Sequence, residues 1–406
     1  MLFNSYTFLI FIIIVLCCYY SLSRKLQNRL LLLASYIFYG WWDWRFLSLL
    51  AISSIVNFFC GKKIASSKNS KIRKMFLIVS LCTNLGILGF FKYCNFFSQN
   101  IHNVLRLVGL QVDFPLLEIL LPVGISFYTF QAMAYTIDIY RRHENPCNNF
   151  WDFALYVSFF PQLVAGPIER SVHLLPQFQS QRKITPEIFY SGCQLILMGY
   201  FKKILIADTA APLVNEIFGN INSAGTFELI IGVYLFALQI YGDFAGYSDI
   251  ARGVSRLFGI NLCLNFKQPY LTANITEFWR CWHISLSSWL RDYLYISLGG
   301  NRHGTLKTYR NIMLTMLLGG LWHGASWNFV IWGGLHGLYL SFHKLMLKGK
   351  KIKYTTKPEK GYHFIKWMLK VFLTFNLVSL TWIFFRAKSL SLAIDFIYNI
   401  FNLTTY

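Results

Sequence analysis

Charged residues are scarce in this sequence, and acidic residues are the scarcest of all. Asp, Glu, Lys and Arg make up 14% of its 406 residues, with 17 acidic against 38 basic side chains. A water-soluble globular domain carries about 25% charged residues, so this composition excludes an ordinary soluble enzyme. The net charge of +21 does not require nucleic acid, because basic residues collect in the cytoplasmic loops of membrane proteins and meet anionic headgroups there. We therefore expect a membrane-lipid partner and no nucleic-acid partner.

The sequence also lacks the spacings of a disulfide framework or a zinc site. Its nine cysteines form no CxxC pair and lie mostly in apolar stretches, where cysteine behaves as a small hydrophobic residue. No GxSxG or HExxH string occurs, and the glycine-rich turn at 299–304 lacks the ending of a P-loop. We therefore expect no metal and no bound cofactor.

Apolar residues dominate instead, at 55% of the chain, and 18% of the chain is aromatic. The first apolar run, 7–23, has no basic residue before it, while Arg24 and Lys25 follow it. These flanks indicate a first membrane span with the N-terminus outside, and not a cleaved signal peptide. The basic residues of 62–74, with no acid among them, place that loop in the cytoplasm.

The remaining apolar runs predict the fold class. They lie at 30–40, 46–61, 75–91, 116–140, 150–167, 188–211, 227–241, 311–320, 325–347, 364–385 and 390–403. We predict a single all-α polytopic membrane domain over 1–406, with roughly ten or eleven membrane segments. Its parts are N-terminal spans (7–140), re-entrant and central spans (150–250), amphipathic helices on the cytoplasmic side (251–310), and a histidine-bearing span with C-terminal spans (311–406).

A polar histidine lies in the segment that follows Asn274. Asn274 stands three residues before Glu277, which is typical of a helix N-cap. From there large apolar residues recur at three- and four-residue steps, so a helix is predicted, with His283 at the border of its apolar face. The imidazole should point into the protein. It is either a structural histidine bonded to a carbonyl group or a functional one.

A second histidine, His323, lies between two apolar spans. Ionisable groups inside membrane segments usually face a wet cavity or the bundle interior and are functional candidates. The flanking glycines, Gly319, Gly320 and Gly324, allow close approach of a helix or of an elongated ligand. Packing explains the glycines but not the imidazole, which is suited to proton transfer near neutral pH.

Other polar residues are weaker candidates. His336 and His343 lie on one face of the next helix among glycines and are interpreted as structural. Lys202 and Lys203 stand in the middle of the run 188–211, which is unfavourable in hydrocarbon unless they snorkel or line a wet cavity. Arg302, in the turn 299–304, is a candidate for phosphate contact.

Several of these strings, in this order, resemble the membrane-bound O-acyltransferase family, in particular its bacterial alginate O-acetyltransferase branch. The matching strings are LPVGISFYTFQ (121–131), AGPIER (165–170), YGDFAGYSD (241–249), FWRCWHISLSSWLRDYLYISLGG (278–300) and GGLWHGA (319–325), and the resemblance extends from the N-terminus to WIFFR (382–386). His323 matches the signature histidine of the family, and His283 matches the second histidine of this branch.

The resemblance implies a bacterial inner-membrane enzyme that moves an acetyl group from a cytoplasmic thioester, with acetyl-CoA as donor, to a polysaccharide outside. An extracytoplasmic acetyltransferase of the SGNH-hydrolase type is the implied partner. His323 would act as general base or as covalent relay, and His283 would bind the acyl carbonyl group. The candidate substrate-binding residues are Trp322, Asn328, Arg291, Asp292 and Arg302.

Alternatives remain at this stage. A related branch transfers D-alanine to teichoic acid with the same kind of histidine, and a transporter or flippase could use His323, Lys202 and Lys203 in substrate passage. Many members of the acetylating branch continue beyond 386 through further membrane segments, so we expect a partner-docking region to be shortened or absent. The acceptor polymer is open among alginate-like polysaccharide, peptidoglycan and other envelope glycans.

Overall fold

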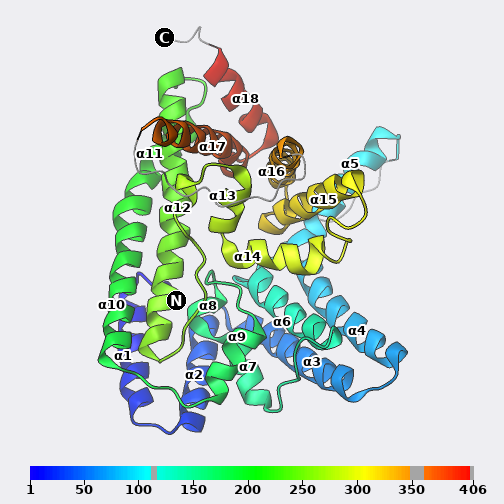
Figure 1. Cartoon of the computed structure of the whole chain (residues 1–406), viewed down its shortest axis with the longest axis vertical. Coiled ribbons are helices and arrows are strands. Elements are labelled where there is room, and N and C mark those ends of the chain that lie inside the picture. Colours follow the sequence, from blue (N-terminus) through cyan, green and yellow to red (C-terminus); the bar gives the residue numbers. More distant parts are fainter. Residues whose placement is uncertain (111–116, 348–360, 403–406) are drawn as a thin grey trace. The chain divides into compact units, whose positions relative to one another are not determined.

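The computed structural model describes residues 1–110, 117–347 and 361–402, and all regular structure within these ranges is helical (Figure 1). The chain divides into two compact units. The first consists of Met1–Tyr200 with Tyr247–Cys263, and the second of Phe201–Gly246 with the described part of Leu264–Tyr406. Each unit is described by itself.

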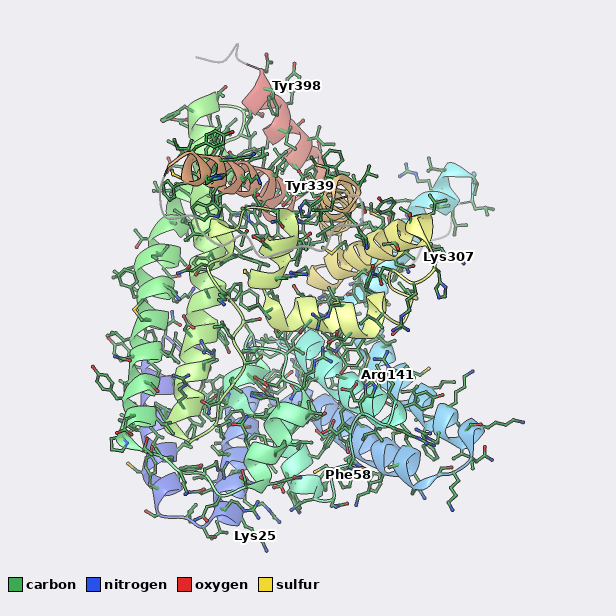
Figure 2. The ribbon with its side chains drawn as sticks, viewed as in Figure 1. Lys25, Phe58, Arg141, Lys307, Tyr339 and Tyr398 are labelled. Atoms are coloured by element: carbon green, nitrogen blue, oxygen red, sulfur yellow. The ribbon has the colours of Figure 1, made fainter. Side chains whose placement is uncertain are left out.

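The first unit is formed by the N-terminal helices. They are α1 (Tyr6–Tyr20), α2 (Arg24–Gly40), η1 (Trp44–Phe46), α3 (Leu47–Ser66), α4 (Ser70–Leu88), the π-helical η2 (Gly89–Tyr93), α5 (Cys94–Leu107), α6 (Ile125–Tyr140), α7 (Phe150–Ser158), α8 (Phe160–Leu163), α9 (Ser171–Gln179) and α10 (Pro186–Tyr200). Figure 2 shows Lys25 at the turn that joins α1 to α2. This is the turn whose charge suggested a cytoplasmic location.

The second unit is formed by the remaining helices. They are the π-helical η3 (Phe201–Asp208), α11 (Thr209–Gly219), α12 (Thr226–Leu257), η4 (Pro269–Leu271), α13 (Ile275–Cys281), α14 (Ile284–Trp289), the π-helical η5 (Leu290–Tyr295), α15 (Thr305–His323), α16 (Trp327–Met346), α17 (Tyr362–Arg386) and α18 (Leu390–Phe401). The last turns of α12, from Tyr247 onward, belong to the first unit.

Among the described residues, four helical stretches are long and apolar enough to cross a membrane, namely Trp44–Ser66, Ser70–Leu107, Thr226–Leu257 and Tyr362–Arg386. The chain is therefore an all-helical membrane protein, as the apolar runs predicted. The number of ten or eleven segments stays a prediction. Leu116 and Leu403, at the ends of two predicted runs, lie outside the described residues.

A buried polar network joins three helices of the first unit. Asn57 of α3 accepts hydrogen bonds from Ser80 (2.6 Å) and Asn84 (3.1 Å) of α4. Ser80 also bonds Thr136 of α6 at 2.8 Å, and Ser53 donates to Asn84 at 2.9 Å. Short polar side chains of this kind hydrogen-bond across membrane helices and fix their packing, where apolar contacts alone are not selective. The three helices lie side by side in Figure 1.

The run 150–167 forms two short helices instead of one long one. In α7, in α8 and at Phe159 between them, nearly every residue is buried inside the first unit, and Phe153, Phe159 and Phe160 are 0% exposed. The nine residues of α7 and four of α8 are too few to cross a bilayer, which takes about 20 residues. Their re-entrant placement in the membrane stays a prediction.

The predicted span 227–241 and the start of the predicted interfacial segment 251–310 lie on one continuous helix. One helix, α12, runs for 32 residues from Thr226 to Leu257. No proline interrupts it, and Gly242 lets it pass close to η3, since an added Cβ would lie 2.9 Å from the carbonyl oxygen of Lys202. The helix therefore continues through the motif YGDFAGYSD.

Lys203 lies in η3 of the second unit and is paired with two carboxylates. Its Nζ is 2.8 Å from Asp208 and 2.6 Å from Asp243. The sequence suggested snorkelling or a wet cavity for this lysine. The ion pairs supply another solution, because an ammonium group with two carboxylate partners is less costly to place in a membrane segment.

Candidate active site

The core of the second unit is aromatic and surrounds the end of α15. The indole rings of Trp332 and Trp382 stack with centroids 5.7 Å apart, and Trp282 lies 5.1 Å from Trp382. All three side chains are buried. Because α13, α16 and α17 each contribute aromatic rings, the core forms a rigid wall around the residues that α15 carries into it.

His323 is the last residue of α15 and lies within this aromatic wall. Its ring centroid is 5.0 Å from Trp322, 5.0 Å from Trp332 and 5.4 Å from Phe385, all in edge-to-face geometry. The helix ends there because Gly324 takes an extended backbone conformation. Edge-to-face contacts with three rings hold the imidazole in one orientation.

The glycines beside His323 serve helix packing. A Cβ at Gly320 would lie 2.1 Å from the carbonyl oxygen of Phe329, and one at Gly324 would lie 2.1 Å from the ring of Phe329. Both positions therefore allow α16 to pack directly against the end of α15. Of the two uses that the sequence allowed for these glycines, the structure shows the packing of one helix on another.

His283 lies beside His323, with the two ring centroids 6.3 Å apart. It is 1% exposed, and its ring packs edge-on against Phe244 of α12 at 4.7 Å. The side chain points into the protein, as predicted. The prediction of one continuous helix is wrong, because His283 has φ = 42° and separates α13 from α14. The start of that helix is confirmed, since the Asn274 side chain caps it by accepting from Glu277 N–H at 3.0 Å.

The hydrogen bonds of Asn265 fix the tautomer of neutral His283. Asn265 Oδ1 accepts from the backbone N–H of Ser285 at 3.2 Å and from its hydroxyl group at 2.9 Å. Because a backbone N–H can only donate, the oxygen of the amide must face this group. His283 Nδ1, 3.2 Å from the same oxygen, is then the donor. A neutral His283 therefore carries its proton on Nδ1 and a lone pair on Nε2.

Burial, and secondarily the nearby His323, holds the pKa of His283 well below its usual range. The neutral form is thus favoured in this part of the chain, which we placed outside the membrane spans. The role that the resemblance implied for His283, binding the acyl carbonyl group, would require an N–H donor on its ring. The neutral ring uses its only N–H group on Asn265, so Nε2 can accept a proton or a hydrogen bond but cannot donate one.

His336 is a third histidine of this core, and both of its nitrogens are used. Trp279 donates its indole N–H to Nδ1 at 3.2 Å, and the hydroxyl group of Thr381 lies 3.0 Å from Nε2. That hydroxyl donates to Val378 O at 2.7 Å, so Nε2–H must be the donor to Thr381. The imidazole is neutral and joins α13, α16 and α17. The structural interpretation of His336 is consistent with these contacts.

Substituting Thr381 tests this chain of hydrogen bonds. Thr381→Val leaves the buried Nε2–H of His336 without an acceptor and is expected to lower the free energy of unfolding by about 1–3 kcal/mol. Thr381→Ser keeps the hydroxyl group and serves as the matched control. Thermal unfolding of the purified protein in detergent compares the two. Equal stability of the valine and serine variants would contradict a hydrogen bond between His336 and Thr381.

The structure brings only some of the predicted site residues together. Trp322 is buried against His323. Asn328 is buried too, and its amide donates to Ala387 O at 2.7 Å, which ties the first turn of α16 to the end of α17. Arg291 and Asp292 pair with each other at 2.7 Å on η5, where Arg291 is exposed. Arg302 lies in an exposed turn before α15.

Sequence reasoning missed Asn265, Trp332 and Phe385. Asn265 lies in an irregular stretch between α12 and η4, 18 positions before His283, so no helical spacing connects the two. Trp332 and Phe385 come from α16 and α17 and resemble ordinary core aromatics in the sequence. Only the folded arrangement shows that they line the ring of His323.

The family of this chain follows from its similarity to known proteins. Residues 75–386 match the model of the membrane-bound O-acyltransferase family, MBOAT. The chain is 43% identical over 395 residues to a Pseudomonas putida protein named as a probable alginate O-acetylase, AlgI, which covers 97% of this chain and 79% of that one. It is 36% identical over 426 residues to a Helicobacter pylori peptidoglycan O-acetyltransferase, with 97% of this chain and 78% of the relative covered.

A more distant similarity is to a teichoic acid D-alanyltransferase of Streptococcus thermophilus. It is 29% identical over 291 residues, which cover 65% of this chain and 68% of the relative. The acetylating relatives are thus similar over a greater share of the chain and at higher identity. Since both the match to the family model and the identity extend over most of the sequence, the chain belongs to the membrane-bound O-acyltransferase family.

Proposed function

We propose that this membrane O-acyltransferase moves an acetyl group from a cytoplasmic thioester to hydroxyl groups of an extracytoplasmic polysaccharide. The observation that carries the proposal is the pairing of His323 with a buried His283, ring centroids 6.3 Å apart, inside an aromatic wall. The relatives named as alginate O-acetylase and peptidoglycan O-acetyltransferase support acetyl as the group and an envelope glycan as the acceptor.

In the proposed reaction His323 acts as general base. It takes the proton of the acceptor hydroxyl group as the hydroxyl oxygen attacks the thioester carbonyl carbon, a role that contributes about 10²- to 10⁴-fold. The carbonyl π electrons move to oxygen, and collapse of the tetrahedral intermediate breaks the C–S bond and releases the thiolate. Partial exposure of His323 allows substrate contact, while the surrounding rings hold its orientation.

A covalent relay is the other route. His323 would attack the thioester carbonyl carbon itself, release the thiol and carry the acetyl group as an acyl-imidazole until an acceptor hydroxyl takes it. The acceptor in either route is the polysaccharide directly or an extracytoplasmic SGNH-type acetyltransferase that completes the transfer. Acetyl-CoA is the proposed donor, and Arg291 and Arg302 on exposed segments are suited to its phosphates.

The proposed setting is the bacterial inner membrane, with the N-terminus outside. The basic residues of 62–74 support this orientation, because they lie in the last turns of α3, in the turn between α3 and α4, and in the first turns of α4, and anionic lipid headgroups on the cytoplasmic side would attract them. Lys68, Lys71 and Lys74 are exposed, which suits contact with lipid. The donor thioester would then reach the protein from the same side.

The test is the release of base-labile esters from envelope polysaccharide. Acetate and D-alanine are measured separately in the native strain, a deletion strain, and deletion strains complemented with native or His323→Ala protein at matched membrane levels. Loss of acetate, restored by native protein but not by His323→Ala, is the expected result. Loss of D-alanine would instead assign the chain to the D-alanylating reaction. If neither ester changes, the transporter hypothesis takes precedence over envelope acylation.

A further inference from the structure

Asn265 is one of the most enclosed polar residues of the second unit. It is 0% exposed and lies in the irregular stretch before η4. Its side-chain oxygen has three donors, two from Ser285 and one from His283. These bonds leave the amide group one orientation, so the position of its nitrogen is as fixed as that of its oxygen.

The nitrogen of this amide is an orphan donor, that is, a buried N–H donor without an acceptor. Asn265 Nδ2 is buried and has no acceptor among the residues that the structure describes. The amide cannot be turned to relieve this, because its nitrogen would then face the backbone N–H of Ser285. A buried donor that stays unsatisfied costs about 1–3 kcal/mol, and such groups are rare in native proteins. A ligand that brings an acceptor oxygen would remove this cost.

A second buried donor without an acceptor among the described residues lies beside the other histidine, His323. Trp332 is 1% exposed, its ring centroid is 5.0 Å from that of His323, and its indole N–H has no acceptor within the described part of the chain. Each histidine of the pair thus has a buried orphan donor beside it. The two donors come from separate elements, Asn265 from the stretch before η4 and Trp332 from α16.

Because neutral His283 carries its proton on Nδ1, stabilising the oxyanion requires a hydrogen-bond donor from another residue. The thioester carbonyl oxygen becomes negative when the acceptor oxygen attacks, and this charge needs N–H or O–H donors that are already in place. Neutral His283 presents a lone pair at Nε2 and cannot supply such a donor. Asn265, held by His283 itself and by Ser285, offers two N–H bonds on the same amide.

We propose that Asn265 is a further catalytic residue, whose Nδ2 donates to the acyl carbonyl oxygen and to the oxyanion that forms from it. The inference rests on the proposed acyl transfer. The new C–O bond forms at the carbonyl carbon, the π electrons move to the carbonyl oxygen, the hydroxyl proton goes to a histidine, and the C–S bond breaks as the oxyanion collapses. Asn265 keeps its protons throughout.

The test compares two buried asparagines. Asn265→Ser removes the amide donor without adding charge, and Asn265→Asp keeps an acceptor oxygen toward Ser285. Asn311→Ser is the matched control, because Asn311 is 1% exposed but its amide donates to the carbonyl oxygens of Leu298 (3.0 Å) and Gly300 (2.9 Å). The purified proteins are assayed for acetyl transfer from acetyl-CoA, and for binding of the ethyl thioether of CoA, which lacks the carbonyl oxygen.

Asn265→Ser and Asn265→Asp are expected to lower kcat by about 10²- to 10³-fold, as loss of one oxyanion donor does, with affinity for the thioether retained. Asn311→Ser is expected to lower the thermal unfolding midpoint while the folded protein keeps its kcat. Native kcat in a folded Asn265→Ser protein would overturn the inference, as would loss of thioether binding equal to the loss of kcat. If native protein itself forms no ester in cells or in this assay, the proposed function fails instead.

Discussion

His323→Ala is expected to lower the rate of acetyl transfer by about 10²- to 10⁴-fold, the contribution typical of a general base. The reason is that no second imidazole can replace it. His336 has both nitrogens engaged, by Trp279 and Thr381, and burial holds the pKa of His283 well below its usual range, so its Nε2 is a weak base. Single-turnover transfer from radiolabelled acetyl-CoA, with purified protein in nanodiscs, measures the loss directly.

The controls separate chemistry from folding. His323→Gln fills more of the space between the aromatic rings than alanine does and is expected to lose as much activity. His303→Ala changes an exposed histidine of the same unit and is expected to keep native activity. Native-like thermal unfolding of His323→Gln together with native activity would show that His323 is not the base.

The same variants distinguish the base from the covalent relay. In the relay, native protein incubated with labelled acetyl-CoA without acceptor retains label that hydroxylamine releases, and His323→Gln retains none. In the general-base route neither protein holds labelled acetyl. The two routes thus predict different results for native protein before any acceptor is added.

The helical fold could be predicted because its signal is local. Apolar runs and the bias of basic residues depend on composition over about 20 residues, so the helical membrane protein followed from the sequence. The breaks within helices could not be predicted in the same way. His283 has the spacing of a residue within a helix, but its φ of 42° depends on the contacts of Asn265 with Ser285, which are formed only in the folded unit.

The residues of the candidate site also differ in whether their signal is local in the sequence. His323 stood out in the sequence because a histidine between apolar spans needs a reason. Asn265 and Trp332 did not, since a single asparagine in a loop and a tryptophan in an apolar helix have many ordinary explanations. Their role depends on burial and on the partners of single atoms, and neither quantity has a pattern along the chain.

Gly333→Ala is the second substitution that we expect to lower kcat strongly, because Gly333 lies where α15 and α16 cross. A Cβ at Gly333 would lie 2.2 Å from the carbonyl oxygen of Met316 and 3.2 Å from the Cα of Gly320. Both are backbone atoms, so no side chain can move aside and the two helices must separate. Overpacking of this kind costs about 1–3 kcal/mol or more. Gly334 is the matched control, because its added Cβ would meet only Leu317 Cδ2 at 3.4 Å, an ordinary contact.

The separation of the helices should change activity more than stability. His323 is on α15 three residues after Gly320, and Trp332, which contacts the ring of His323, is next to Gly333 on α16. A displacement of about 1 Å in a catalytic group can cost about 10²-fold in rate. We therefore expect Gly333→Ala to lower kcat by about 10²-fold and Gly334→Ala to keep it, with a small gain in stability from the better helix former. Equal kcat values for the two alanine variants, measured on folded protein, would mean that the crossing of α15 and α16 does not position His323.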